Sequence, residues 1–271
     1  WGVVSSPFDE LAEGVYRRRY ASLDLNIGVV VGGDGVLVVD SRASHSQAQE
    51  LRDELADLTD QPVGWVVNTH WHWDHVFGNA MFPEARLWGQ RECRNHLMEH
   101  GEEQKAAARE RVGPEHAHLI DEVVITPPEY VVGKARAIDV GGRTVTLEHM
   151  GLGHTNSDLV VMVSDAPVMF AGDLVEEGAP PGFGDGYPMA WPDTVDRLRD
   201  HIRGVVVPGH GDVMDAGAVK TQHEELTAVA QACADGLSSG RFDPEVGPYP
   251  AESMRTAWER AKLEFEVRAE G

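Results

Sequence analysis

Short apolar runs bounded by glycine and polar residues fill two separate stretches of the chain. Residues 27–31 form such a run, residues 32–35 (Gly-Gly-Asp-Gly) are typical of a hairpin turn, and residues 36–40 lead back. Beyond residue 120, similar runs predict strands at 123–125, 135–140, 144–148, 159–163 and 168–171. The pattern therefore predicts two blocks of strands.

A segment whose apolar residues have helical spacing follows the first block of strands. Ser44 and Gln47 are spaced as a capping box, and apolar residues then recur every three or four positions at Ala48, Leu51, Leu55 and Leu58. This predicts a helix over residues 44–59, and a short helix should follow at 76–82. Strands, helix and strand in this order are expected of one half of a layered α/β sandwich.

The charged stretch 89–121 predicts one helix on either side of Gly101, with a further break at Gly113. Histidines on a polar helix are most often solvated. We therefore expect no ligand role for the four histidines of this stretch, which are His96, His100, His116 and His118.

The C-terminal part contains two helical faces separated by the turn-rich residues 236–250. The first face consists of Leu226, Val229, Ala230 and Cys233, and the second of Met254, Trp258, Ala261 and Phe265. We predict one domain over residues 1–235, followed at 236–271 by a linker and a helix that packs on the same domain.

Composition and charge narrow the range of partners. The chain has 271 residues and 42% apolar residues, enough for one large core. Asp and Glu outnumber Lys and Arg by 45 to 23, a formal net charge of −22 that repels polyanions, so we expect no nucleic-acid partner. The longest apolar runs have about five residues, against the ~20 that a membrane helix needs, so we expect no membrane partner either.

The two cysteines, Cys93 and Cys233, fall in different helical segments and lack metal-ligand spacing. They could pair, but free thiols in a reducing cytoplasm are the expectation. The chain begins at Trp1 without a visible signal peptide. We therefore predict a cytoplasmic protein, although an export signal removed before Trp1 fits the sequence as well.

Metal-type side chains cluster directly after the apolar run 65–67. Residues 68–75 (Asn-Thr-His-Trp-His-Trp-Asp-His) place three imidazoles and a carboxylate within six positions, at His70, His72, Asp74 and His75. Such side chains bind zinc or iron without thiolates. Their spacing is too tight for one helical face, where ligands would recur at i and i+4, so we expect a strand that ends in a loop.

Three further candidates follow apolar strands and a glycine. His154 comes after Gly153, Asp173 after Gly172, and His210 after Gly209. Glycine allows the sharp turn and the close backbone approach that a ligand at a strand end needs. One such residue is usually structural, but four sites in one chain predict a metal centre.

These motifs resemble those of the metallo-β-lactamase-fold hydrolases, from about residue 10 to 215. The resemblance implies an α/β fold, a four-layer αββα sandwich with the metal site on loops at one edge of the two sheets. Two metal ions are implied as well, the first held by His70, His72 and His154, the second by Asp74, His75 and His210, and both bridged by Asp173. Asp40, which ends a predicted strand, is either a turn residue or an acceptor behind the metal ligands.

The implied function is zinc-dependent hydrolysis with two zinc ions per chain, iron or manganese being the other candidate metals. A water bridging the metals, deprotonated at neutral pH, would attack a small ester, lactone, thioester or β-lactam, and Asp74 would orient it as the catalytic residue. True lactamases of the family often lack the bridging carboxylate or the Asp-His pair, so the chain looks more like the broad dinuclear hydrolases. The alternative is a persulfide-dioxygenase-like enzyme with non-haem iron.

The segment 176–192 starts three residues after Asp173 and holds aromatic residues without helical or strand period. We predict that Phe183, Tyr187 and Trp191 bind the substrate, with Trp71 and Trp73 facing the same cleft. The alternative is a surface connection whose aromatic side chains pack on the body of the protein.

Overall fold

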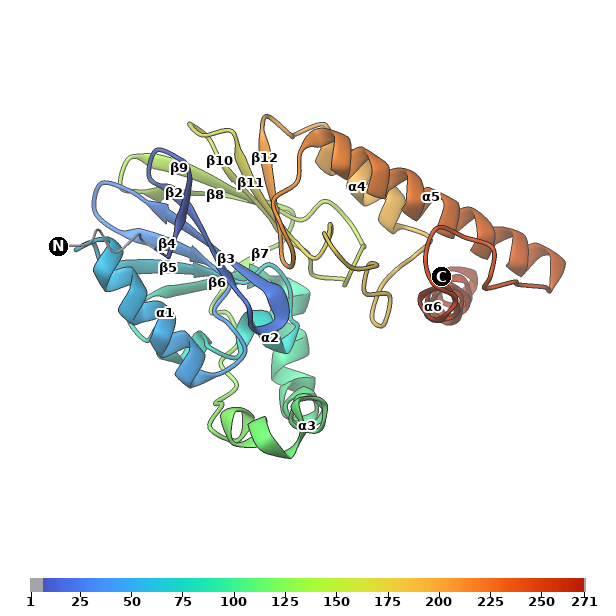
Figure 1. Cartoon of the computed structure of the whole chain (residues 1–271), viewed down its shortest axis with the longest axis horizontal. Helices are drawn as coiled ribbons and strands as arrows, with labels where there is room; N and C mark the ends of the chain where they lie inside the picture. The colour runs from blue at the N-terminus through green and yellow to red at the C-terminus, as the bar shows by residue number, and fades with distance from the viewer. Residues whose placement is uncertain (1–6, 271) are drawn as a thin grey trace.

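Two β-sheets lie face to face in the computed structural model, which describes residues 7–270 except for the side chains of 267–270 (Figure 1). The first sheet has seven strands in the order β1 (Asp9–Ala12), β2 (Val15–Tyr20), β3 (Leu25–Val31), β4 (Val36–Val39), β5 (Val63–Val67), β6 (Arg86–Gln90) and β7 (Tyr130–Val132). The second has five, in the order β12 (Val205–Pro208), β11 (Val168–Gly172), β10 (Val160–Val163), β9 (Arg143–Glu148) and β8 (Ala135–Val140). Trp1, with the start of the predicted domain, lies outside the described residues.

Helices cover the outer face of each sheet (Figure 1). On the first sheet lie α1 (His45–Leu58), the one-turn α2 (Trp73–Val76) and α3 (Arg91–Asp121); on the second lie α4 (Trp191–Arg199) and α5 (Ala216–Ser239). The last helix, α6 (Ala251–Glu270), packs beside α5, and the short helices η1 (Ser22–Asp24) and η2 (Asn79–Met81) lie in connections. This is the four-layer αββα sandwich that the family resemblance implied.

The alternation of side chains along the strands explains why two layers of core form. In β4, Val36 and Val38 pack with α1, whereas Leu37 and Val39 pack between the two sheets. All four side chains are buried, as expected for a strand covered on both faces. The predicted helix at 44–59 is confirmed as α1, whose N-cap Ser44 accepts a hydrogen bond from the backbone N–H of Gln47.

Two predictions near α3 are wrong. Gly101 does not break the helix, because a Cβ there would lie 2.6 Å from Ile125 Cγ2 and the glycine serves close packing instead. The predicted break at Gly113 is confirmed by a φ of +74°. Residues 123–125 form no strand, because β6 pairs in parallel with β7 further along the chain.

The C-terminal helix docks through most of the predicted face, with Met254, Trp258 and Ala261 packed on the core. Met254, Ala257 and Ala261 are fully buried, whereas Phe265 is 55% exposed, so its predicted place on the docking face is wrong. Trp258 stacks on Phe242 at 4.8 Å between ring centroids. The division into a domain at 1–235 and an appended helix remains a prediction.

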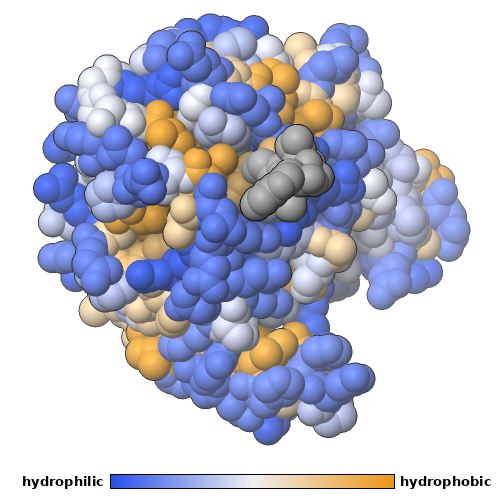
Figure 2. Space-filling view, turned by 60° about the vertical axis from the view of Figure 1, so that its left-hand side comes forward, coloured by the Kyte–Doolittle hydropathy of each residue, from blue (hydrophilic) through white to orange (hydrophobic). Residues whose placement is uncertain are grey.

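Cys93 and Cys233 are both buried free thiols, in α3 and α5 respectively. Three consecutive arginines of β2 each form an ion pair with a nearby carboxylate: Arg17, Arg18 and Arg19. The face in Figure 2 is mostly hydrophilic with scattered apolar residues. Among the described residues, no helix has the length and apolar character that crossing a bilayer requires.

Candidate metal centre

The predicted ligands meet where strands of both sheets end. His70 and His72 lie in the loop after β5, Asp173 directly follows β11, and His210 follows β12. A Cβ on Gly209 would lie 1.8 Å from Asp173 Oδ1, so glycine is required before His210 for the two ligand segments to approach. His154 lies between β9 and β10, and Asp74 and His75 belong to α2.

Four of these side chains form the first group, His70, His72, His154 and Asp173, whose ligand atoms lie within 4.8 Å of one another. His154 Nε2 lies 2.8 Å from His72 Nδ1 and 3.4 Å from Asp173 Oδ2. His70 Nε2 lies 3.7 Å from the same carboxylate oxygen.

The second group consists of Asp74, His75 and His210. His210 Nε2 lies 3.3 Å from both Asp74 Oδ2 and His75 Nε2. Asp173 connects the two groups, because its Oδ1 lies 3.4 Å from His75 Nε2 and its Oδ2 lies 3.4 Å from His210 Nε2. All seven predicted ligands thus converge, with one carboxylate between two clusters.

The polar atoms at the centre fit a cation. His70 is fully buried, and neither its Nε2 nor Asp173 Oδ1 has a hydrogen-bond partner among the described residues. A buried polar atom without a hydrogen bond costs about 1–3 kcal/mol, and cations held by the two groups would satisfy these atoms. Imidazole and carboxylate ligands suit zinc, and they also suit iron and manganese.

Four of the ligand histidines fall into two classes by the direction in which their surroundings shift the pKa. Burial and the neighbouring His75 lower the pKa of His70, and burial together with His72 lowers the pKa of His154 to about 3. Burial also opposes protonation of His75 and His210, but the carboxylates of Asp173 and Asp74 outweigh it and raise the pKa of both. Without a metal the second group therefore holds protons, which a cation would displace.

Behind the second group, Asp40 accepts three hydrogen bonds with its buried carboxylate. The donors are the Thr69 backbone N–H at 2.7 Å, the Thr69 hydroxyl at 2.8 Å and His75 Nδ1 at 2.8 Å. This contact leaves His75 Nε2 to bind a metal. Of the two interpretations of Asp40, the structure supports an acceptor behind the ligands.

Two other ligand rings are oriented in the same way. His70 Nδ1 lies 3.0 Å from the Thr69 hydroxyl, whose own proton is donated to Asp40. His210 Nδ1 donates to the carbonyl oxygen of Leu23 in η1 at 2.8 Å. Leu23 has a left-handed backbone (φ +64°), a conformation that is uncommon for a non-glycine residue and that clusters at functional sites. No feature of the sequence indicated this carbonyl contact.

Comparison with known proteins agrees with this geometry. The sequence pattern described as the metallo-beta-lactamase superfamily matches residues 23–210. The chain belongs to the metallo-beta-lactamase superfamily. The metallo-beta-lactamase from Pontibacter korlensis has a similar structure, with a TM-score of 0.67, 19% identity, and coverage of 81% of this chain and 98% of that one. The DIM-1 metallo-beta-lactamase gives a TM-score of 0.64 at 18% identity, covering 81% of this chain and 96% of that one.

Two curated proteins are similar in sequence. A metallo-beta-lactamase type 2 of Bacillus sp. (strain 170) is 24% identical over 188 residues, which are 68% of this chain and 65% of that protein. A linear primary-alkylsulfatase of Pseudomonas sp. (strain ATCC 19151) is 22% identical over 214 residues, or 66% of this chain and 40% of that protein. The chain therefore spans less than two thirds of the length of either relative.

The three predicted substrate-binding residues differ in exposure. Trp191 is fully buried, donates its indole N–H to the Leu174 carbonyl at 3.0 Å, and lies 5.6 Å from the His154 ring. Phe183 is 2% exposed and packs against Trp191. The Trp191 ring thus packs beside His154 and Phe183 packs on Trp191, and a substrate-binding role for these two buried rings remains a prediction. The partly exposed Tyr187 remains a candidate.

The two tryptophans that lie between the ligands in the sequence also have different surroundings. Trp71 is 8% exposed, stacks on His96 at 3.6 Å and donates to Asn156. Trp73 lines a cavity of about 230 Å³ together with Leu23, Val112 and other residues of α1 and α3. The Leu23 carbonyl accepts a hydrogen bond from His210, and Trp73 directly precedes Asp74, so two residues of the cavity wall are neighbours of the second group.

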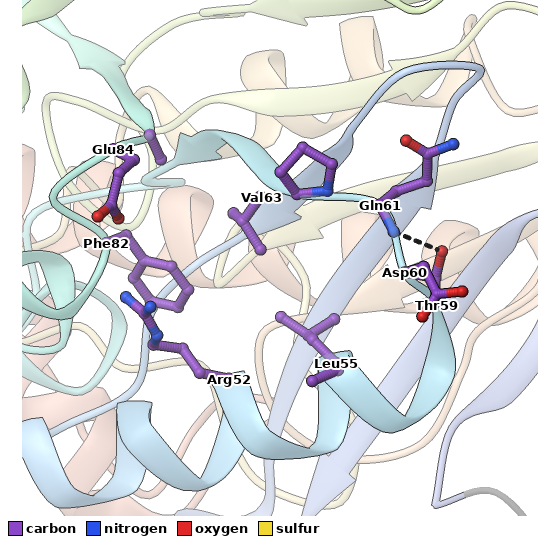
Figure 3. A pocket seen from close by; sticks show the side chains of 11 residues that line it. Arg52, Leu55, Thr59, Asp60, Gln61, Val63, Phe82 and Glu84 are labelled. Atoms are coloured by element: carbon purple, nitrogen blue, oxygen red, sulfur yellow. Dashed lines mark hydrogen bonds between the residues drawn. The ribbon is translucent and has the colours of Figure 1, made fainter.

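A cavity of about 500 Å³ lies at the other end of β5, between α1 and η2 (Figure 3). Arg52 lies over the Phe82 ring there at 5.7 Å, and Leu55 and Val63 contribute apolar surface. None of the seven candidate ligands lines it. None of them lines the cavity next to Trp73 either, but the Leu23 carbonyl there contacts His210 and Trp73 precedes Asp74, so of these two cavities it is the nearer to the ligands.

Proposed function

We propose that this protein is a zinc-dependent hydrolase with two zinc ions per chain, acting on a small ester, lactone, thioester or β-lactam. The observation that carries the proposal is the position of Asp173, whose oxygens lie 3.4 Å from ligand atoms of both groups. A carboxylate between two sets of imidazole ligands supports a pair of cations sharing one bridging ligand. The complete set of seven ligands argues against a site that has lost its metals.

Zinc ions held by the two groups would lower the pKa of a bound water towards about 7 and would polarise the substrate oxygen. The part left to the protein would be to orient that water. Burial alone would raise the pKa of Asp74, but His75 and His210 lower it more strongly. Asp74 is therefore a carboxylate at neutral pH, able to accept a hydrogen bond from the water as well as to bind the second metal.

The cavity next to the second group supports a substrate with an apolar substituent. Its walls include the half-buried Trp73, the buried Ile120, and Leu23, which is 41% exposed. Apolar walls beside a few polar groups are typical of small-molecule sites. Tyr187, on the side of the first group, would donate a hydrogen bond to the substrate oxygen.

The test is to purify the protein from metal-balanced medium, measure its metal content, and assay a panel of lactones, thioesters, aryl esters and β-lactams. An alkyl sulfate belongs in the panel because one relative is a linear primary-alkylsulfatase. We expect two zinc ions per chain, loss of hydrolysis on chelation, and recovery on adding zinc. A single tightly bound iron, with no hydrolysis after zinc is added, would instead favour the dioxygenase alternative.

A further inference from the structure

His72 is oriented differently from the other ligand imidazoles of its group. Its Nδ1 faces His154 Nε2 at 2.8 Å, whereas His70 and His154 direct Nε2 towards the centre. The Nε2 of His72 consequently points away from the ligands and lies 3.2 Å from Asp185 Oδ2. If Nδ1 binds the metal, Nε2 carries the proton, and Asp185 is its acceptor.

Asp185 lies in a turn that is itself attached to the metal site. The Gly186 backbone N–H donates to the Phe183 carbonyl at 3.1 Å, and the Tyr187 N–H donates to the Gly153 carbonyl at 2.8 Å. Gly153 directly precedes the ligand His154. The turn that carries Asp185 is thus hydrogen-bonded to the loop that carries the neighbouring ligand.

The C-terminal helix fixes the same turn from the other side. Arg260 of α6 donates from Nε to the Gly186 carbonyl at 3.0 Å and from Nη2 to the Asp185 carbonyl at 3.2 Å. Further along the loop, the Met189 backbone N–H donates to Glu264 Oε2 at 2.9 Å. Helix α6 lies outside residues 23–210, the part that matches the superfamily.

We propose that Asp185 is a positioning residue of the metal centre, and that Arg260 acts through it. The Asp185 carboxylate holds His72 with the proton on Nε2 and the lone pair of Nδ1 towards the first metal. Arg260 keeps the Asp185 turn at the distance that this contact needs. The C-terminal helix is therefore part of the metal site rather than a mere covering of α5. This inference rests on the metal centre of the proposed function.

The Asp185 side chain is 52% exposed. Because of this exposure, we expect a substitution of Asp185 to change metal affinity and not folding stability. Water screens an exposed ion pair, so the contact contributes little to folding. Its effect lies in the orientation and basicity of one ligand ring, and removing such an acceptor typically weakens metal binding by about 10- to 100-fold. The His72 group should lose affinity, and the Asp74 group should not.

The experiment measures both zinc affinities by competition with chelators, in the full-length protein and without substrate. Asp185→Ala and Arg260→Ala are the test variants, and Asp185→Glu is the conservative one. Asp60→Ala, at an exposed carboxylate beyond α1, controls for lost charge, and Arg255→Ala, at an exposed arginine of α6, controls for the helix. Nitrogen-15 NMR of the zinc-loaded protein reports which nitrogen of His72 carries the proton.

We expect Asp185→Ala to lower the affinity for one of the two zinc ions by about 10- to 100-fold, and Asp185→Glu to restore part of that affinity. Arg260→Ala should weaken the same ion to a smaller extent, and its effect should vanish in the Asp185→Ala background, because both act on one contact. Equal weakening of both ions, or wild-type affinities in Asp185→Ala, overturns the inference. If the wild-type protein binds no metal at His72, the proposed function itself fails, so the two failures are distinguishable.

Discussion

Replacing Asp40 by asparagine tests how the protein prepares its ligands. The carboxylate is 1% exposed and accepts hydrogen bonds from Thr69 and His75. The backbone of Asp40 is left-handed, with a φ of +67°. Asparagine tolerates this conformation about as well as aspartate does, so Asp40→Asn changes the acceptor without adding backbone strain.

The magnitude follows from the three hydrogen bonds. In Asp40→Asn, the new amide oxygen would replace one carboxylate oxygen and still accept from the Thr69 N–H. The new NH₂ group would replace Oδ2, which receives two donors, the Thr69 hydroxyl and His75 Nδ1. Losing two buried charge-assisted hydrogen bonds of about 1.5–3 kcal/mol each gives about 3–6 kcal/mol. This loss of free energy is divided between folding stability and zinc binding. For zinc binding we expect the affinity to fall by about 10- to 100-fold.

The assay combines urea denaturation of the metal-free protein with chelator competition for zinc. Asp60→Asn, which changes an exposed carboxylate beyond α1, is the matched control. The sum of the two losses in Asp40→Asn should reach several kcal/mol, with the metal of the His75 group affected. If the variant unfolds within about 0.5 kcal/mol of the wild type and binds both ions equally well, the reasoning about this carboxylate is refuted.

Three further outcomes are expected. Asp74→Ala should keep its circular dichroism spectrum, but its activation barrier should rise by several kcal/mol, and each ~1.4 kcal/mol lowers the rate tenfold. Activity within threefold of the wild type would show that Asp74 is not catalytic. Trp73→Ala should raise KM for substrates with long apolar substituents more than for acetyl esters, and an equal change for both would place the substrate elsewhere. Zinc binding near neutral pH should release protons and tighten as pH rises, because the pKa values of His75 and His210 are raised in the metal-free protein. Calorimetry in buffers of different ionisation enthalpy measures the proton release. A zinc affinity independent of pH would contradict this expectation.

The ligand set could be predicted from the sequence because its signals are local. Asp173 and His210 follow apolar strands and a glycine, and each strand end carries its ligand to the same edge. The close approach of Gly209 to Asp173 shows the physical reason for that glycine. A pattern of strand, glycine and ligand therefore has the same meaning at each position where it occurs.

The remaining features depend on contacts between distant residues. Gly101 was interpreted as a break because glycine disfavours helices, but Ile125 lies where a side chain at that position would be. An aromatic residue in a loop has the same local signature whether it faces a cleft or a core. Phe183 is buried partly by Tyr249, at 6.0 Å between ring centroids, which comes from the C-terminal part of the chain. Asp185 is 113 residues from His72, and no spacing rule connects them.

The acceptors behind the ligands determine how much metal binding contributes to the stability of this fold. Four ligand histidines have the outer nitrogen paired, with Thr69, Asp185, Asp40 and the Leu23 carbonyl. These acceptors are carried by separate connections that the two sheets bring together, so the rings are oriented by the folded sandwich itself. The entropic cost of assembling the site therefore falls mainly on folding and not on binding. Zinc should then stabilise an existing structure by mass action, by about 2.7 kcal/mol at a hundred times its Kd, and not create the fold as it does in small zinc domains.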